Sequence, residues 1–227
     1  MKKTLLSTLL LAKLALGSLV PATSFEPQKA SSLAKDLAHN HYMNNQYEEA
    51  IPLFEKAIEQ AEATSSDSLD IAVLHGKLGY CFTKTGQVER ATEADSIACT
   101  YGPSEALLFN NWANSLYEAG RTERSFEVAS EGFRILQEQQ RELELEASTP
   151  DSHLQKKMFQ YEEAYLASTM ASIQEQLYMT NGQPTHLQAA RTNYQRAMEL
   201  LQTTSRTPED KQLLEKCKTK IEELKEK

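Results

Sequence analysis

The sequence has too few cysteines and histidines, in the wrong arrangement, for a metal or redox site. Its three cysteines, Cys81, Cys99 and Cys217, form no CxxC pair, and none has a histidine in ligand register. His39 and His41 are two residues apart, so on a helix they point to different sides and cannot share a metal ion. We therefore expect no metal and no other cofactor. An odd number of cysteines leaves one unpaired, and we expect buried free thiols rather than a disulfide.

Catalytic signatures are missing as well. The chain contains no HExxH, GxSxG or GxGxxG motif and no glycine-rich loop that could hold a phosphate. Its many acidic residues follow the faces of predicted helices, which is typical of a solvated surface. We predict that the protein is not an enzyme. The alternative is an enzyme subunit or a hydrolase without a recognisable motif, and its nucleophile would then be Cys81 or Cys99.

The chain has no excess of basic residues. It carries 24 lysines and arginines against 32 aspartates and glutamates, a formal net charge of −8. An acidic protein gains no counterion release from a phosphate backbone, and anionic lipid surfaces repel it. We therefore expect no nucleic acid and no anionic membrane surface as a partner.

No apolar run is long enough to span a membrane, but residues 1–24 have the features of a secretory signal peptide. They read MKKTLLSTLLLAKLALGSLVPATS, with two lysines, a leucine-rich stretch and small residues suited to cleavage at 20–24. Lys13 interrupts the apolar run and would be costly at the centre of a bilayer. We predict export to the periplasm or cell envelope, with no integral membrane segment in the mature chain. The alternative is an amphipathic N-terminal helix that stays on a cytoplasmic protein.

Residues that break helices are scarce. There are eight glycines and seven prolines, aromatic residues make up 7% of the chain, and Ala, Leu, Glu, Gln and Lys are abundant. This composition favours helix throughout.

A repeat of 34 residues organises the middle of the chain. Five matches share this displacement: Leu78–Gly79 with Trp112–Ala113, Phe82 with Leu116, Gly86 with Gly120, Ala91 with Ser125, and Ala98 with Gly132. The residues before Gly86 have helical spacing, Gly86 breaks the chain, and a second helical series follows. A fixed period of helix–turn–helix units is the signature of a solenoid.

The period and its order of small and large residues resemble the tetratricopeptide repeat, and Tyr47 to Ala50 with Phe54 and Ala57 is the best local match. The resemblance implies an all-α, right-handed superhelical solenoid with a C-terminal capping helix. It places repeats at about 31–64, 72–105 and 106–139, a degenerate repeat at 151–204 and the capping helix at 207–227. The first two repeats are seven residues further apart than the period, and we expect a longer loop at 63–68.

A long helical hairpin over 122–180 departs from the family pattern. Phe133 and Leu143 lie at heptad positions of its first helix, and a stripe of large side chains lies on its second helix: Leu154, Met158, Tyr161 and Tyr165. We predict that the two seams pack together as an antiparallel pair and that the tip projects beyond the body.

The first helices of such repeats form a concave surface that binds a peptide or a partner's helix, so candidate binding residues are sought there. In members that clamp the C-terminal carboxylate of chaperones, lysines, asparagines and an arginine converge on this surface. Lys35 keeps such a charge here, but His39, Lys77, Leu107 and Asn111 replace the other residues of the clamp. We therefore do not expect binding of chaperone tails.

Asparagines and tyrosines occupy the same surface instead. Asn110, Asn111 and Asn114 fall within one helix, with Tyr80 and Tyr117 nearby, and asparagine is a mediocre helix former. Either they are solvated surface, or they form a ladder of amides that pairs with the backbone of an extended peptide.

Together these patterns predict a non-catalytic scaffold that binds another protein or a peptide in an exported assembly. The alternative is a cytosolic chaperone or adaptor. The sequence leaves the oligomeric state and the partner open.

Overall fold

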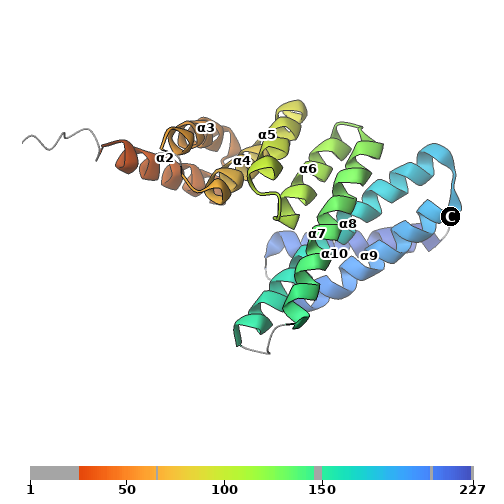
Figure 1. Cartoon of the computed structure of the whole chain (residues 1–227). Helices are drawn as coiled ribbons and strands as arrows, with labels where there is room; N and C mark the ends of the chain where they lie inside the picture. Colours follow the sequence, from red (N-terminus) through yellow and green to blue (C-terminus); the bar gives the residue numbers. More distant parts are fainter. Residues whose placement is uncertain (1–25, 65, 146–149, 205–206, 226–227) are drawn as a thin grey trace, which may run out of the picture.

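The computed structural model describes residues 26–64, 66–145, 150–204 and 207–225, and every secondary-structure element within them is an α-helix (Figure 1). The helices are α2 (Glu26–Met43), α3 (Tyr47–Ala63), α4 (Ser68–Lys84), α5 (Val88–Tyr101), α6 (Ala106–Glu118), α7 (Thr122–Leu145), α8 (Pro150–Asn181), α9 (Pro184–Thr204) and α10 (Pro208–Lys225). The predicted signal peptide, 1–24, lies outside the described residues. None of the described helices is both long and apolar enough to cross a membrane.

Consecutive helices pack in pairs, and the pairs stack in a row (Figure 1). The units are α2–α3, α4–α5, α6–α7 and α8–α9, and each second helix also packs against the first helix of the next unit. Helix α10 packs on α9 at the C-terminal end. The predicted all-α solenoid of paired helices, with a capping helix at its end, is therefore confirmed.

Each unit turns at one residue with a left-handed backbone. The φ angles are 58° at Asn45, 75° at Gly86, 71° at Gly120 and 68° at Gly182. Glycine adopts this conformation without a Cβ penalty, and asparagine tolerates it better than most other residues. The recurrence of Gly86 and Gly120 in the sequence thus reflects a backbone requirement of the turn.

Length differences between the units lie in the helices, which corrects the long loop expected at 63–68. Helices α3 and α4 each have 17 residues, whereas α5 has 14 and α6 has 13. Three extra residues in α3 and four in α4 account for the excess. The polar segment starts a helix because Asp67 accepts a hydrogen bond from the backbone N of Leu69 at 2.9 Å and so caps α4.

Helices α7 and α8 extend beyond the body as a two-helix arm (Figure 1). Leu143 of α7 is buried, but Leu154 and Met158 of α8 are 57% and 55% exposed, so the seam predicted for them is wrong. In the body α8 packs against α6, α7 and α9, and its buried side chains lie on several sides of the helix. Ala167 belongs to a cluster with α9, for example, whereas Ile173 belongs to a cluster with α6 and α7. Because α8 has neighbours on several sides, a heptad pattern in its sequence does not show which side packs against α7.

The cysteines are buried free thiols, as expected. His75 also lies in the core, where its ring stacks on Tyr101 with the centroids 6.0 Å apart. Within the described ranges, His, Cys, Asp and Glu side chains form no group of three or more that could hold a metal ion.

A buried carboxyl group occupies a tight crossing between α4 and α5. A Cβ added at Gly79 would lie 2.1 Å from Asp95 Oδ1, so only glycine leaves room for this carboxyl. Asp95 is 1% exposed, and its Oδ2 accepts a hydrogen bond from Ser115 Oγ of α6. Its Oδ1 has no hydrogen-bond partner among the residues that the structure describes. Burial raises the pKa of Asp95 to about 7, and the hydrogen bond from Ser115 lowers it in part.

We expect this carboxyl to make folding stability fall as the pH rises. Between the unfolded pKa, about 4, and the folded pKa, the folded chain binds a proton that the unfolded chain does not, so stability is lost through this window. The Asp95→Asn variant lacks this loss and should gain up to about 4 kcal/mol relative to the wild type between pH 4 and pH 8. Urea unfolding at several pH values measures the difference. Glu59→Gln, at an exposed position of α3, is the control, and an equal pH profile for both variants would contradict the assignment.

Candidate functional site

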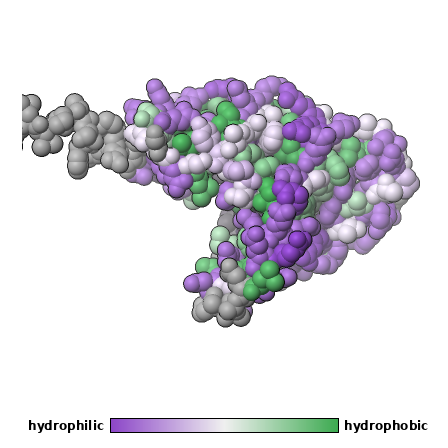
Figure 2. All heavy atoms as spheres, in the orientation of Figure 1, coloured by the Kyte–Doolittle hydropathy of each residue, from purple (hydrophilic) through white to green (hydrophobic). Residues whose placement is uncertain are grey.

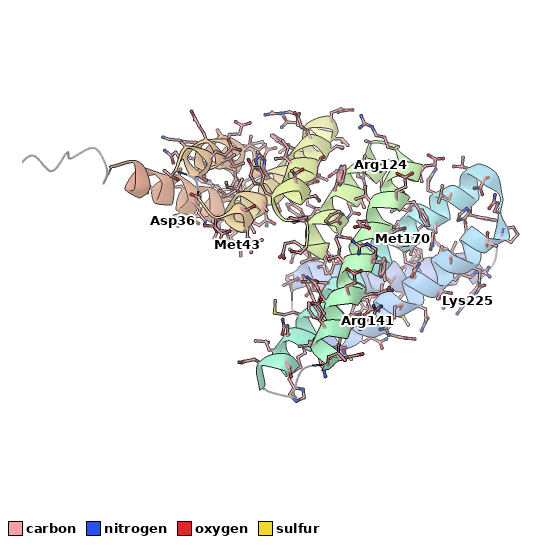
Figure 3. All side chains as sticks on the ribbon, in the orientation of Figure 1. Asp36, Met43, Arg124, Arg141, Met170 and Lys225 are labelled. Carbon is pink, nitrogen blue, oxygen red and sulfur yellow. The ribbon has the colours of Figure 1, made fainter. Side chains whose placement is uncertain are left out.

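A groove of about 940 Å³ runs along the concave side of the solenoid. Most of its lining comes from α2, α4, α6, α8 and α10, called the groove helices below, with Tyr47 added by α3. Figure 2 shows a recess between the N-terminal units and the arm, and Figure 3 places Met43, a groove residue, at this recess. A second cavity of about 350 Å³ shares Tyr80, Tyr165 and Glu209 with the groove and so continues it.

One wall of the groove is a cluster of three tyrosines from three helices. The ring centroids are 5.5 Å apart for Tyr42 and Tyr80, 5.7 Å for Tyr47 and Tyr80, and 6.1 Å for Tyr42 and Tyr47. The rings are inclined to one another by 59°, 69° and 75°, arrangements that aromatic quadrupoles favour. Burial raises the pKa of all three hydroxyl groups, so each stays protonated at neutral pH and can donate a hydrogen bond.

The opposite wall is formed by α8 and the start of α10. Tyr161 and Tyr165 of α8 have ring centroids 4.8 Å apart, and Tyr165 Oη donates to Asp210 Oδ1 at 2.7 Å. The backbone N of Thr207 donates to Asp210 Oδ2 at 2.8 Å, and the backbone N of Asp210 donates to Thr207 Oγ1 at 3.1 Å. This is a reciprocal capping box at the start of α10. Tyr165 thus ties the capped end of α10 to α8 and brings Glu209 to the edge of the groove.

Helices α4 and α6 form the floor. They approach closely at Gly76, where an added Cβ would lie 2.9 Å from Leu108 Cδ2. Asn111 lines the groove, and its side chain makes no hydrogen bond within the described part of the chain. Asn110 is only 3% exposed, and its Oδ1 accepts a hydrogen bond from Thr169 Oγ1 of α8 at 2.7 Å. Asn110 is therefore not the solvated residue considered above, because it joins α6 to α8.

Lysines lie beside the tyrosine cluster. The Lys77 ammonium is 3.1 Å from His39 Nδ1 and 5.9 Å from the centroid of the Tyr42 ring, and the Lys84 ammonium is 5.0 Å from the centroid of the Tyr80 ring. Burial and the charge of nearby Lys35 lower the pKa of Lys77. No carboxylate pairs with Lys77 within the described residues.

Acidic groups lie at the other margin. Glu105, at the start of α6, and Glu209 of α10 both line the groove. Burial and the charge of Glu105 raise the pKa of Glu162 on α8 to about 7. The groove is thus basic beside the tyrosine cluster and acidic near the starts of α6 and α10.

The structure gathers some of the predicted binding residues and separates others. Lys77, Tyr80, Asn110 and Asn111 line the groove, and Asn114 lines the adjoining cavity. Among the described residues that line the two cavities, Lys35, His39 and Tyr117 do not occur. Lys35 pairs with Asp70 at 3.0 Å, and His39 contacts Lys77. Tyr117 is partly buried against a cluster formed by α6, α7 and α8. A role in binding stays a prediction for all of them.

Sequence reasoning missed most of the aromatic lining. Tyr42, Tyr47, Tyr161 and Tyr165 line the groove, although their pattern indicates packing residues. The available signal was the recurrence of tyrosine on the first helices of the units. The start of α10 was not predictable as a wall, because its position depends on a contact between residues far apart in the chain.

Comparisons with known proteins show the fold and nothing finer. No protein-family model matches the chain, and no curated protein matches it. The structure of PilF from Pseudomonas aeruginosa has a TM-score of 0.55 and 16% identity, over 87% of this chain and 71% of its own. BtubC (BKLC) from P. vanneervenii has a TM-score of 0.55 and 17% identity, over 88% of this chain and 82% of its own. At this identity the likeness shows a shared helical-repeat architecture.

Loss of the Tyr165 hydroxyl should loosen the start of α10. In Tyr165→Phe the buried carboxylate of Asp210 loses a donor, and we expect the free energy of unfolding to fall by about 1–2 kcal/mol. Amide hydrogen exchange in the first turn of α10 should become faster. The control is Tyr178→Phe on the same helix, whose hydroxyl makes no hydrogen bond within the described ranges. Equal exchange in the two variants would show that Tyr165 does not hold this wall.

Proposed function

We propose that the protein is a non-catalytic scaffold whose concave groove holds an exposed segment of a partner protein. The observation that carries the proposal is the continuous groove of about 940 Å³ with five tyrosines in its lining. Tyrosine supplies a large, rigid contact surface together with a polar hydroxyl, which suits it to binding surfaces. A groove of this kind is suited to a polypeptide segment and less suited to the flat surface of a folded partner.

The state of the thiols argues against the enzyme alternative. Burial raises the pKa of Cys81 and of Cys99 to about 12, so at neutral pH both are protonated thiols. A protonated, buried thiol is a poor nucleophile. The residues that sequence reasoning offered for covalent catalysis therefore do not support it.

We further propose that this scaffold acts in an exported assembly, in the periplasm or cell envelope. Two lysines followed by a leucine-rich stretch and small residues at 20–24 support this location. The cytosolic adaptor remains the competing proposal, because Lys13 interrupts the apolar stretch.

Site-specific photo-crosslinking in the native cell tests the groove. A photoreactive residue at Met43, which is 64% exposed and lines the groove, should give a defined protein adduct. The same residue at Glu93, exposed on α5 and outside the groove lining, should not. Adducts at Glu93 with none at Met43 would move the binding surface to the opposite side of the solenoid.

The N-terminus of the protein isolated from its native cell tests the location. Export predicts a mature chain that begins after about residue 24 and is found outside the cytosol. Mass spectrometry of the intact protein from each cell fraction measures this. A cytosolic protein that retains residues 1–24 would favour the adaptor.

A further inference from the structure

We propose that the groove binds a proline-rich segment in the extended polyproline II conformation. The inference rests on the proposed function and names the chemistry of its ligand. It is carried by the arrangement of the aromatic rings and by the hydrogen-bonding groups that the lining leaves unused.

The rings form two facing walls rather than a single packed stack. Tyr42, Tyr47 and Tyr80 stand on one side and Tyr161 and Tyr165 on the other, all within one lining. The three rings of the first wall contact one another at steep angles, so together they form one continuous aromatic surface. A polyproline II helix has three residues per turn, so it presents pyrrolidine rings to both walls at once, and aromatic-lined grooves recognise it in this way.

The lining has more donors than acceptors on its basic side, since only one acceptor, His39 Nδ1, lies within hydrogen-bond distance of the three N–H groups of Lys77. The Lys77 ammonium and the Asn111 side-chain amide have no carboxylate or carbonyl partner within the described residues. Two nearby acceptors are already used, since Asn45 Oδ1 accepts from Tyr47 Oη at 2.6 Å and Asn110 Oδ1 accepts from Thr169. Asn111 Oδ1 is the acceptor that the described lining leaves open beside Lys77. A ligand that fits must therefore supply carbonyl oxygens and few N–H groups.

A proline-rich segment meets this requirement. Its backbone has no internal hydrogen bonds, so every carbonyl oxygen points outward, and proline has no N–H to satisfy. An amphipathic helix has its carbonyl groups bonded internally, so its backbone offers no acceptor to Lys77 and Asn111. An added β-strand would bring N–H groups that find few free acceptors beside the tyrosine cluster.

Titration of the full chain with a blocked oligoproline of about ten residues tests the inference. A glycine–serine peptide of equal length and an amphipathic helical peptide are the comparison probes. We expect the oligoproline to shift the NMR signals of the groove tyrosines and to bind at least tenfold more tightly than either comparison peptide. Tighter binding of the helical peptide, or equal binding of all three, would overturn the proposal.

Single variants test the contribution of the tyrosine rings to binding separately from that of the hydrogen-bond donors. Tyr80→Ala should weaken oligoproline binding at least tenfold, and Tyr80→Phe, which keeps the ring, should retain most of it. Asn111→Ala and Lys77→Met should each weaken binding several-fold, whereas Tyr178→Phe, outside the groove, should not change it. If Tyr80→Ala is unfolded, Asn111→Ala and Lys77→Met decide the matter, and unchanged binding in both overturns the donor argument.

Failure of this inference can be told apart from failure of the proposed function. If Met43 crosslinks to a partner through a segment without prolines and the oligoproline does not bind, the proposed scaffold function is supported and the proline-rich ligand is ruled out. If Met43 gives no adduct while the oligoproline binds with the expected variant profile, the proposed ligand class is supported and the proposed function in the cell is contradicted.

Discussion

Close contact between consecutive helices is the constraint on which the whole molecule depends. A solenoid has no central core, so each helix can bury its apolar side only against its neighbours. Alanines at the crossings, such as Ala38, Ala50, Ala91 and Ala98, are fully buried, and Gly79 leaves room for the Asp95 carboxyl. Because the helices approach so closely, side chains on successive first helices come within contact distance. The ion pair of Lys35 with Asp70 and the ring contact of Tyr42 with Tyr80 both join α2 to α4 in this way. The groove is thus a consequence of the stacking and needs no separate element to build it.

Most of the fold could be predicted because its signals are local. A small residue at a crossing or a glycine with positive φ at a turn is required by the backbone of a single unit, so Gly86 and Gly120 mark the period in the sequence itself. The errors arose where a local pattern had more than one outcome. Polar residues before α4 are typical of a loop, yet Asp67 uses its carboxylate to start the helix. The stripe that includes Leu154 and Met158 fits a heptad seam, yet α8 has neighbours on several sides and this stripe faces solvent.

Less of the candidate site could be predicted, because its walls come from residues that have no sequence relation to one another. The lysine, tyrosine and asparagine positions on α4 and α6 follow from the repeat, and the structure places Lys77, Tyr80 and Asn111 in one groove. The far wall does not follow from the repeat, since α8 is 32 residues long against 13 in α6 and therefore carries its tyrosines in a different register. The hydrogen bond from Tyr165 to Asp210 joins residues 45 positions apart, and no sequence pattern in either segment predicts it. Burial of Asn110 likewise depends on Thr169, which lies on a helix two elements away.

The groove helices all run in the same direction, so the two ends of the groove differ. Successive contacts from α2 to α4 and from α8 to α10 pair residues in ascending order on both helices, as parallel neighbours must. Each helix start carries about half a positive charge and each helix end about half a negative one, so the starts collect at one end of the groove and the ends at the other. The side chains offset these charges, with Glu105 and Glu209 near the starts of α6 and α10 and Lys84 in the last turn of α4. A chain that lies along this groove meets a different sign of side-chain charge at each of its own ends. A chain bound in the opposite direction would place each of its ends beside side chains of the opposite charge. The two directions of binding are therefore not equivalent.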